Sequence, residues 1–338
     1  MRTSDGLLWM GFDGQDAPGV PEDLAPGGVI LFGRNLNPDP AAGPARCKAL
    51  LDTLHARFGG ESTLAVALDQ EGGAVSRLRP WVGPTPALRR IWTARGAAGC
   101  EAWGRLWGEG LGLLGFNVDF APVADLWDGH PEAGIGDRAA SAEPVEVAAA
   151  VGAFLHGLES TGVRGCLKHF PGLGGTTVDS HLGLPELADR ARVDRNAGPF
   201  VALSHEDRLV MVAHLRTPLS DLPASLDRGQ VADNPWGVRG RFLPDDLEMG
   251  GCAAWDWDAR VARCLEAGHE WLLVCQSGAG VRACAEAAAK LPAAAVDGAL
   301  RRNRAMRANL RLPSPGALDR AAWGAWVDRV RAEAAALA

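Results

Sequence analysis

Several features that define whole classes of protein are missing from this chain of 338 residues. It has no apolar run of about 18 residues, so no transmembrane helix is expected. The N-terminal segment MRTSDGLLWMGFDGQDAPG is interrupted by Gly11, Asp13 and Gly14 and does not fit a secretory signal, which favours a cytoplasmic location. The net charge is −7 and no basic stripe occurs, which argues against a nucleic-acid surface and a polybasic membrane anchor.

Tyrosine is absent, although the chain has twelve tryptophans, some of which are candidates to line a sugar site. Cysteine is present without a pattern, because there are seven residues, an odd number, and no two have CxxC spacing. This distribution indicates buried apolar thiols in a reducing cytoplasm. Nothing in the sequence predicts a metal or another cofactor.

The length and composition fit a barrel built from alternating strands and helices, a fold that typically needs about 250 residues. The apolar fraction of 47% can fill a large core. Short, nearly continuous apolar runs are typical of parallel strands covered on both faces. We predict eight: Leu7–Phe12, Gly28–Phe32, Leu64–Leu68, Val118–Pro122, Gly165–Lys168, Leu209–Ala213, Arg241–Pro244 and Trp271–Cys275.

Helical segments lie between most of these runs. The clearest spans about 144–160, where Val147, Val151, Leu155 and Leu158 form an apolar stripe at helical spacing and Gly162 supplies a stop. Others are expected near 43–58, 97–113, 256–267 and 280–290. The pattern predicts an α/β protein, a single-domain (β/α)8 TIM-type barrel over 1–338. Residues 279–338 would supply the last barrel helix and a helical C-terminal extension.

Polar and ionisable residues follow the predicted strands, where the active sites of such barrels lie. Asp69 ends the third strand, Lys168 and His169 end the fifth, His214 ends the sixth and Asp245 follows the seventh. Arg77 and Arg138 lie in nearby loops. Carboxylates accept hydrogen bonds from sugar hydroxyls, and Lys and Arg donate to ring or carbonyl oxygens. The mixture therefore suits a polar substrate rich in hydroxyl groups.

The densest motif is KHFPGLGGTTVDSH at 168–181, which resembles the signature of family 3 glycoside hydrolases in the bacterial β-N-acetylglucosaminidase branch. Seven further strings are similar to motifs of that family and occur in its order, over about residues 25–310. They are GGVILFGRN at 27–35, ALDQEGGAVSRL at 67–78, FNVDFAPVADL at 116–126, IGDR at 135–138, MVAH at 211–214, DDLEM at 245–249 and AGHEWLLVC at 267–275.

The resemblance implies a retaining β-N-acetylglucosaminidase that acts on cell-wall muropeptide-type substrates. It identifies Asp245 with the nucleophile that forms a covalent glycosyl-enzyme, His181 with the acid/base and Asp179 with its partner. An Asp that accepts from one imidazole nitrogen fixes the tautomer and raises the basicity of the other. The histidine can then protonate the leaving oxygen and later activate water. Because a histidine repels an anion less than a carboxylate does, transfer of the sugar to phosphate is a further possibility.

The same resemblance assigns the sugar-binding groups. It implies that the substrate is held by Asp69, Arg77, Arg138, Lys168, His169 and His214. The only partner expected is a small saccharide or muropeptide. Asp119 and Asp125, in the fourth strand region, are expected to support the barrel interior rather than to act in catalysis.

The chain departs from the family pattern in the fifth-strand loop, where Leu173 replaces a histidine and Gly175 replaces an aspartate. A sugar-binding or catalytically impaired member of the family is therefore a second hypothesis. A metal-dependent hydrolase that uses His169, His181, His214 and a carboxylate is a third, although no HxH or HExxH motif supports it. Taken alone, Asp179 and His181 are equally typical of a loop turn with a solvated histidine.

Overall fold

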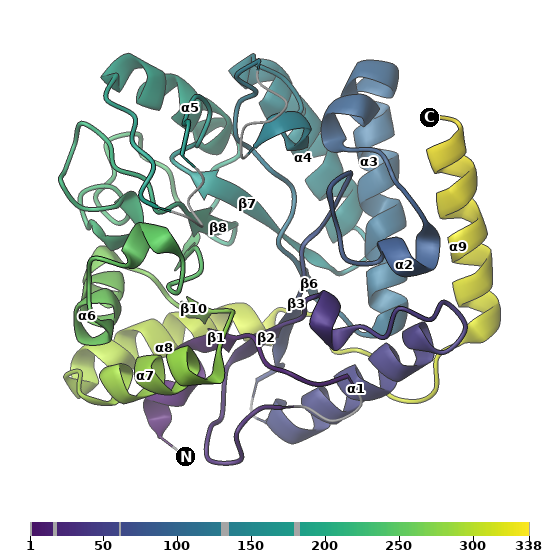
Figure 1. The fold of residues 1–338 in the computed structure, drawn as a ribbon, viewed down its shortest axis with the longest axis horizontal. Helices are drawn as coiled ribbons and strands as arrows, with labels where there is room; N and C mark the ends of the chain where they lie inside the picture. Colours follow the sequence, from purple (N-terminus) through teal and green to yellow (C-terminus); the bar gives the residue numbers. More distant parts are fainter. Residues whose placement is uncertain (1, 16–18, 61, 130–134, 179–182, 338) are drawn as a thin grey trace.

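The computed structural model describes residues 2–15, 19–60, 62–129, 135–178 and 183–337, and its parallel strands form two four-stranded sheets (Figure 1). One sheet has the order β10-β1-β2-β3 and the other has the order β6-β7-β8-β9. The strands are β1 (Leu8–Met10), β2 (Gly28–Ile30), β3 (Ala65–Ala67), β6 (Val118–Asp119), β7 (Arg164–Phe170), β8 (Leu209–Val212), β9 (Arg241–Pro244) and β10 (Leu272–Val274). Each lies within or across one of the eight predicted runs.

Backbone hydrogen bonds also connect the two sheets at both edges. The amide of Phe120, just after β6, donates to the carbonyl of Leu68, just after β3, at 2.9 Å. On the other side, the amide of Glu270 before β10 donates to the carbonyl of Phe242 in β9, also at 2.9 Å. The chain therefore has an α/β fold in which parallel strands follow one another in sequence order around a shared interior.

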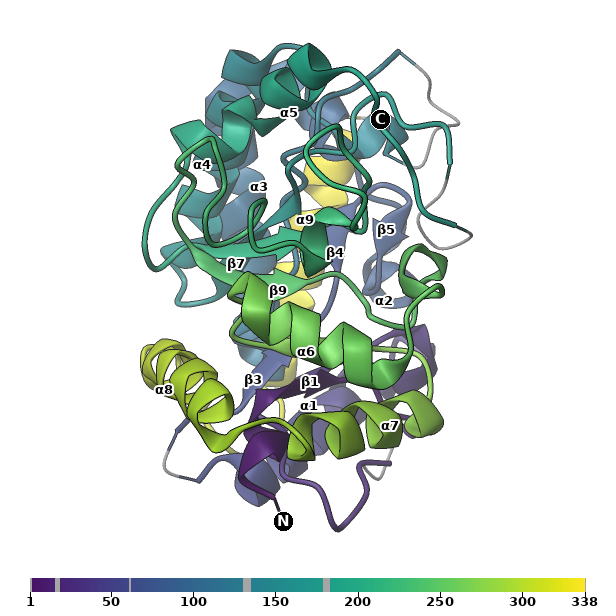
Figure 2. The same cartoon turned by 90° about the vertical axis from the view of Figure 1, so that its left-hand side faces the viewer.

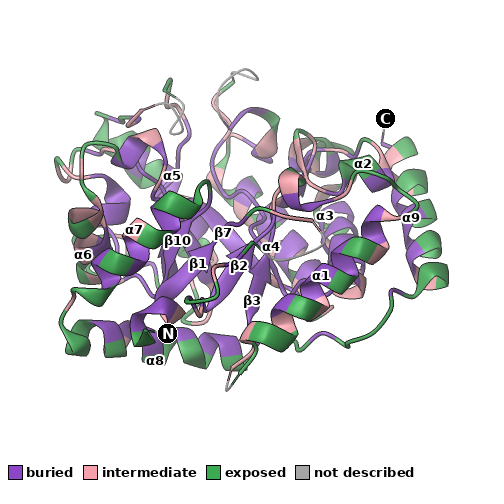
Figure 3. Cartoon of the chain, turned by 60° about the horizontal axis from the view of Figure 1, so that its bottom comes forward, coloured by how far each residue is buried: buried purple, intermediate pink, exposed green. Residues whose placement is uncertain are grey.

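Helices cover the outer faces of the sheets (Figures 1 and 2). Their bounds are α1 (Gly43–Phe58), α2 (Arg79–Val82), α3 (Leu88–Leu114), α4 (Pro144–Glu159), α5 (Arg190–Ala202), α6 (Trp257–Ala267), α7 (Gly278–Ala289), α8 (Ala293–Ala308) and α9 (Arg320–Ala335). Short 3₁₀ segments occur at Thr3–Leu7, Gly33–Asn35, Gly136–Arg138, Ala224–Leu226 and Gly250–Cys252. Figure 3 shows the expected consequence, with buried helix faces toward the strands and exposed faces outward. Among the described residues, no helix combines the length and apolar character needed to cross a membrane.

Local sequence explains where these helices begin and end. In α4, Pro144 occupies the first turn, where a missing amide hydrogen costs nothing, and the predicted stripe from Val147 to Leu158 is buried. In α6, the Asp256 carboxylate accepts from the amide of Ala259 at 2.8 Å. Gly268 then ends α6 in the left-handed conformation, with φ of 106°.

Side chains alternate along the strands between the shared interior and the helix-facing layer. The interior row includes Trp9, which lies 4.6 Å from Trp271 and 4.8 Å from Phe120 between ring centroids. The Trp9 indole also donates to the carbonyl of Val29 at 2.9 Å. Large rings therefore fill the strand interior, and a substrate cavity must lie beyond them at the ends of the strands.

The predicted C-terminal extension is helical. Helix α9 packs along α3, and Trp326 joins the two because its indole nitrogen donates to the carbonyl of Leu106 at 2.6 Å. Trp323 meets Trp81 of α2 edge-on, with 5.9 Å between ring centroids. Several tryptophans thus bind the extension to the body of the molecule.

Candidate active site

A cavity of about 200 Å³ lies at the carboxyl ends of the strands. Its polar lining comes from the end of β7 and from the segments after β3, β6, β9 and β10. The ends of β3, β7 and β9 are among the strand ends where the sequence predicted chemistry. The polar lining residues are Asp69, Glu71, Arg77, Arg138, Lys168, His169, Thr176, Asp245, Asp246 and Gln276. No described tryptophan lines the cavity, so the expectation of a tryptophan-lined sugar site is wrong for this part of the chain. The aromatic residues present are Phe32 and Phe120.

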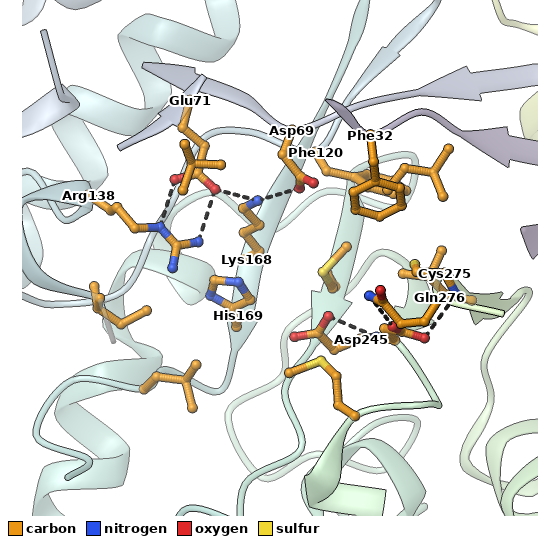
Figure 4. A pocket seen from close by; sticks show the side chains of 18 of the residues that line it. Phe32, Asp69, Glu71, Phe120, Arg138, Lys168, His169, Asp245, Cys275 and Gln276 are labelled. Atoms are coloured by element: carbon orange, nitrogen blue, oxygen red, sulfur yellow. Dashed lines mark hydrogen bonds and ion pairs between the residues drawn. The ribbon is translucent and has the colours of Figure 1, made fainter. Parts of the chain in front are cut away.

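One side of the cavity is a network of opposite charges, which we call the charged wall: Asp69, Glu71, Arg77, Arg138 and Lys168. Figure 4 shows four of these residues, Asp69, Glu71, Arg138 and Lys168, side by side. The Lys168 ammonium lies 2.9 Å from Asp69 Oδ1 and 2.5 Å from Glu71 Oε1. Arg138 binds Glu71 through two nitrogens, at 2.8 and 2.9 Å. Arg77 donates to Asp69 Oδ2 at 3.1 Å.

The charges fix the protonation states of this wall. Burial raises the pKa of Glu71, but Arg138 and Lys168 outweigh that effect and hold it well below its usual value. The pKa of Asp69 is also lowered, because Lys168 and Arg77 oppose the effect of burial. Burial lowers the pKa of Lys168, and its two carboxylate neighbours raise it well above the ordinary value. Carboxylates and cations are therefore charged together near neutral pH.

A two-stranded hairpin, β4 (Gln70–Gly72) and β5 (Val75–Ser76), brings Arg77 back beside Asp69. Gly72 and Gly73 make the turn with φ of 95° and 57°, a conformation that favours glycine. The Gln70 side chain closes the hairpin, because its amide nitrogen donates to the Ser76 hydroxyl at 2.9 Å. The two glycines that follow Glu71 therefore make the turn that returns Arg77 to Asp69.

His169 is held by Asp125, whose predicted support role agrees with these contacts. Its Nδ1 lies 2.7 Å from Asp125 Oδ2, and the other carboxylate oxygen accepts from the amide of Leu173 at 2.7 Å. One buried carboxylate thus orients both the imidazole and the start of the loop after β7. Asp119 is buried as well, and burial raises its pKa well above the ordinary value.

The two carboxylates after β9 have different surroundings. Asp245 points into the cavity, and its Oδ1 accepts from the amide of Asp246 at 2.8 Å (Figure 4). No ion pair joins Asp245 to a cation within the described ranges. Asp246 is buried and accepts from the amides of Glu248 and Cys275, at 3.1 and 3.0 Å. Burial raises the pKa of Asp246.

The structure places His214 beneath this Asp pair and not on the cavity surface. The ring is fully buried, with Nε2 2.9 Å from the carbonyl of Asp246 and Nδ1 2.7 Å from the Ser225 hydroxyl. Burial lowers the pKa of His214, but Cys252, Asp245 and the carbonyl of Asp246 raise it to about 9. Alternate residues of a strand face the same side, and Val210 and Val212 of β8 face the helix layer. His214 follows in the same alternation, so its side chain also points away from the strand interior.

The predicted acid/base His181 and its partner Asp179 lie outside the described residues. The cavity therefore brings together Asp69, Arg77, Arg138, Lys168, His169 and Asp245 from the sequence-based set. It also contains Glu71, which sequence reasoning missed. The available signal was spacing, because Glu71 lies two residues after Asp69 and such residues face the same side of an extended chain.

No group of three or more His, Cys, Asp or Glu side chains that could hold a metal occurs in the described part of the chain. His169 Nδ1 is engaged by Asp125, and both nitrogens of His214 face partners in the protein interior. The described geometry gives no support to the metal-dependent hypothesis.

Comparisons with known proteins agree on a single family. Residues 15–307 match the model described as the glycosyl hydrolase family 3 N-terminal domain. The chain is 34% identical to a β-hexosaminidase of Methylococcus capsulatus over 325 residues, which cover 90% of this chain and 92% of the relative.

Two solved structures extend the likeness to the fold. A family 3 glycosyl hydrolase of Mycobacterium smegmatis matches with a TM-score of 0.80 and 30% identity, over 91% of this chain and 97% of that one. NagZ of Neisseria gonorrhoeae, solved with N-trifluoroacetyl-D-glucosamine, matches with a TM-score of 0.77 and 27% identity, over 98% of each chain.

Proposed function

Because this chain belongs to glycosyl hydrolase family 3 and is a glycoside hydrolase, we propose that it is a retaining β-N-acetylglucosaminidase. Its substrate is a terminal β-linked N-acetylglucosamine. The β-hexosaminidase relative and the N-acylglucosamine bound by the NagZ neighbour support this choice of sugar. The observation that carries the proposal is the Asp245 carboxylate, which faces the cavity without a cationic partner among the described residues.

In the first step, Asp245 attacks the anomeric carbon and the bond to the leaving oxygen breaks. Among the described residues, the Asp246 amide donates to Asp245 Oδ1 and no cation forms an ion pair with this carboxylate. An ionised carboxylate that no cation neutralises can act as a nucleophile. The Asp246 amide fixes the carboxylate and leaves the second oxygen toward the cavity. The product of this step is a covalent glycosyl ester on Asp245.

His181 acts as the acid that protonates the leaving oxygen, and as the base that takes a proton from water in the second step. Asp179 accepts from the other imidazole nitrogen and sets the tautomer. Both assignments rest on the motif that ends the loop after β7. Release of the ester by water returns the Asp245 carboxylate and gives a sugar of retained configuration.

The charged wall binds the hydroxyl groups of the sugar. Asp69 accepts hydrogen bonds from hydroxyls, and Lys168, Arg77 and Arg138 donate to oxygens, each held in place by its partners. His169 contributes Nε2, because Asp125 already engages Nδ1. His214 contributes by holding the Asp245–Asp246 segment.

We further infer that the two sheets form one closed (β/α)8 barrel within a single domain of residues 1–338. The backbone bonds from Phe120 to Leu68 and from Glu270 to Phe242 support closure. Cell-wall muropeptide-type glycosides are the natural substrate class in this proposal.

Hydrolysis of 4-nitrophenyl glycosides tests the function. Wild type should release nitrophenol from the β-N-acetylglucosaminide far faster than from the β-glucoside, and Asp245→Asn and His181→Ala should both lose this activity. Folded wild type that binds N-acetylglucosamine but releases nitrophenol from neither substrate would contradict the proposal and favour a sugar-binding protein.

A further inference from the structure

Three buried side chains beneath the Asp245–Asp246 pair are joined by hydrogen bonds, and we call them the support network: His214, Ser225 and His269. We propose that the support network positions the nucleophile Asp245 without contact to the substrate. The proposal rests on the proposed function, because it takes Asp245 as the nucleophile. To the support by His214 it adds two residues and the order of donors and acceptors that links them.

Asp246 is the residue through which the network reaches the nucleophile. Its amide donates to Asp245 Oδ1 at 2.8 Å, and its carbonyl lies 2.9 Å from His214 Nε2. Asp246 is therefore held on one side of its backbone by the ring, while the other side holds the attacking carboxylate. A shift of this backbone would move the amide that orients Asp245.

The ring of His214 connects the turn after β9 to another strand. The Met249 amide also donates to the carbonyl of Asp246, at 2.9 Å, but Met249 belongs to the same turn and moves with it. His214 instead follows β8, so its bond fixes the turn relative to the neighbouring strand. Contacts of this kind hold a reacting group within the small tolerance that catalysis requires.

The position of the proton on the His214 ring follows from its partners. A carbonyl oxygen can only accept, so the bond to Asp246 requires a proton on Nε2. Nδ1 lies 2.7 Å from the Ser225 hydroxyl and 3.3 Å from the Cys252 sulfur. A hydroxyl can donate to a neutral ring or accept from a charged one, so Ser225 serves Nδ1 in both states. The bond to Asp246 is therefore independent of the charge on the ring.

Ser225 is itself fixed from two sides. It lies in the 3₁₀ segment Ala224–Leu226, and its amide donates to the carbonyl of Ala213 at 3.2 Å. Its carbonyl lies 2.7 Å from Nε2 of His269, a fully buried ring just before β10. Burial lowers the pKa of His269 to about 4, so this ring is neutral near pH 7 and donates from Nε2. The support network thus connects the segments after β8 and β9 to the segment before β10.

Close packing leaves the His214 ring little room to move. Gly251, from the segment after β9, lies against it so closely that a Cβ at this position would be 2.6 Å from the Cβ of His214. A methyl group there would collide, so glycine is required. Packing and hydrogen bonds together therefore hold one orientation of the ring.

Two substitutions of His214 separate the bond to Asp246 from the other contacts of the ring. The amide nitrogen of Gln can take the place of Nε2 and donate to the carbonyl, whereas that of Asn lies near Nδ1 and does not reach it. His214→Asn should lower kcat for 4-nitrophenyl β-N-acetylglucosaminide about 100-fold, the loss that a displacement of about 1 Å can cause. His214→Gln should recover most of this loss. KM should change little in either variant, because neither touches the charged wall.

Ser225→Ala and a distant histidine complete the set. Ser225→Ala should lower kcat about fivefold, the value of one hydrogen bond, because the Cys252 sulfur remains beside Nδ1. His55→Asn is the matched control, since Nε2 of His55 lies 3.0 Å from the carbonyl of Gly115 on the outer helix α1, away from the cavity. This variant removes a bond of the same kind and should keep the wild-type kcat.

Steady-state kinetics on variants shown to be folded by circular dichroism and urea unfolding measures these effects. Wild-type kcat in His214→Asn, equal losses in the Asn and Gln variants, or an equal loss in His55→Asn would overturn the positioning role and leave the proposed function in place. If His214→Asn does not fold, Ser225→Ala decides, and wild-type kcat in that variant would overturn the role. Folded wild type that releases no nitrophenol would overturn both the proposed function and the positioning role.

Discussion

The carboxylates at the end of β3 and the carboxylate after β9 face the same cavity under opposite conditions. Asp69 and Glu71 are held by three cations, with Lys168 shared between them. Asp245 has a backbone amide as its partner and no ion pair within the described residues. The difference separates two tasks, because a paired carboxylate is fixed and weakly basic, whereas an unpaired carboxylate can attack a carbon atom.

Asp245→Asn is the variant expected to have the largest effect on this difference, because it keeps the shape of the side chain and removes its charge. We expect kcat/KM for the N-acetylglucosaminide to fall about 1000-fold or more, as for loss of a nucleophile in other enzymes. Asp256→Asn is the matched control, because this residue caps α6 outside the cavity and Asn caps equally well. Comparable losses in both variants would remove the special role of Asp245.

Glu71→Gln tests the paired side of the comparison. The variant leaves Lys168 and Arg138 with one fewer negative charge in a buried setting, and we expect a loss of about 3 kcal/mol in the free energy of unfolding. Glu101→Gln supplies the control, because Glu101 pairs with Arg105 on an exposed helix surface and should change stability by about 0.5 kcal/mol or less. Urea unfolding measures the free energy of unfolding of both variants. Equal losses would show that the charged wall stabilises the fold no more than a surface ion pair does.

The pH dependence of stability should follow the same wall. Because the pKa values of Asp69 and Glu71 are lowered in the folded protein, their stabilisation is present above the unfolded carboxyl pKa of about 4 and is lost as the pH falls. The melting temperature should therefore decline between about pH 5 and pH 3. Glu71→Gln should flatten that decline, and an identical slope in the variant would count against this origin.

The smallest expected effect is at the exposed edge of the wall. Arg77 makes one contact to Asp69 and lies 5.3 Å from the Phe32 ring centroid. Arg77→Lys keeps the charge but weakens the ring contact, which is worth about 0.5–1 kcal/mol. We expect KM to rise about three- to fivefold with kcat nearly unchanged, as steady-state kinetics would measure. A large fall in kcat would instead place Arg77 in the chemical step.

The strands and most helices could be predicted, because continuous apolar runs and apolar residues at helical spacing indicate which side chains are buried. The β4–β5 hairpin could not, since it contains two very short strands and depends on the turn at Gly72 and Gly73. Asp69, Lys168 and Asp245 were found as strand-end residues, and each continues the inward row of its strand. The ion pair of Glu71 with Arg138 spans 67 residues and leaves no local trace in the sequence.

Alternation along a strand explains the remaining differences. His214 follows the outward row of β8, so it supports the Asp pair from behind. Simple alternation along β7 would point His169 toward the helix layer, like Leu167. His169 lines the cavity instead, because the strand register shifts between Leu167 and Phe170. A register irregularity of this kind depends on the neighbouring strands, and no single-strand pattern reports it.

The nucleophilic role of Asp245 can be tested by trapping the glycosyl-enzyme with a 5-fluoro analogue of N-acetylglucosaminyl fluoride and locating the attached sugar by peptide mass spectrometry. We expect one sugar per chain, attached to the peptide that contains Asp245, and no label in Asp245→Asn. A label on another carboxylate, or rapid turnover of the analogue with inverted products and no label, would contradict it.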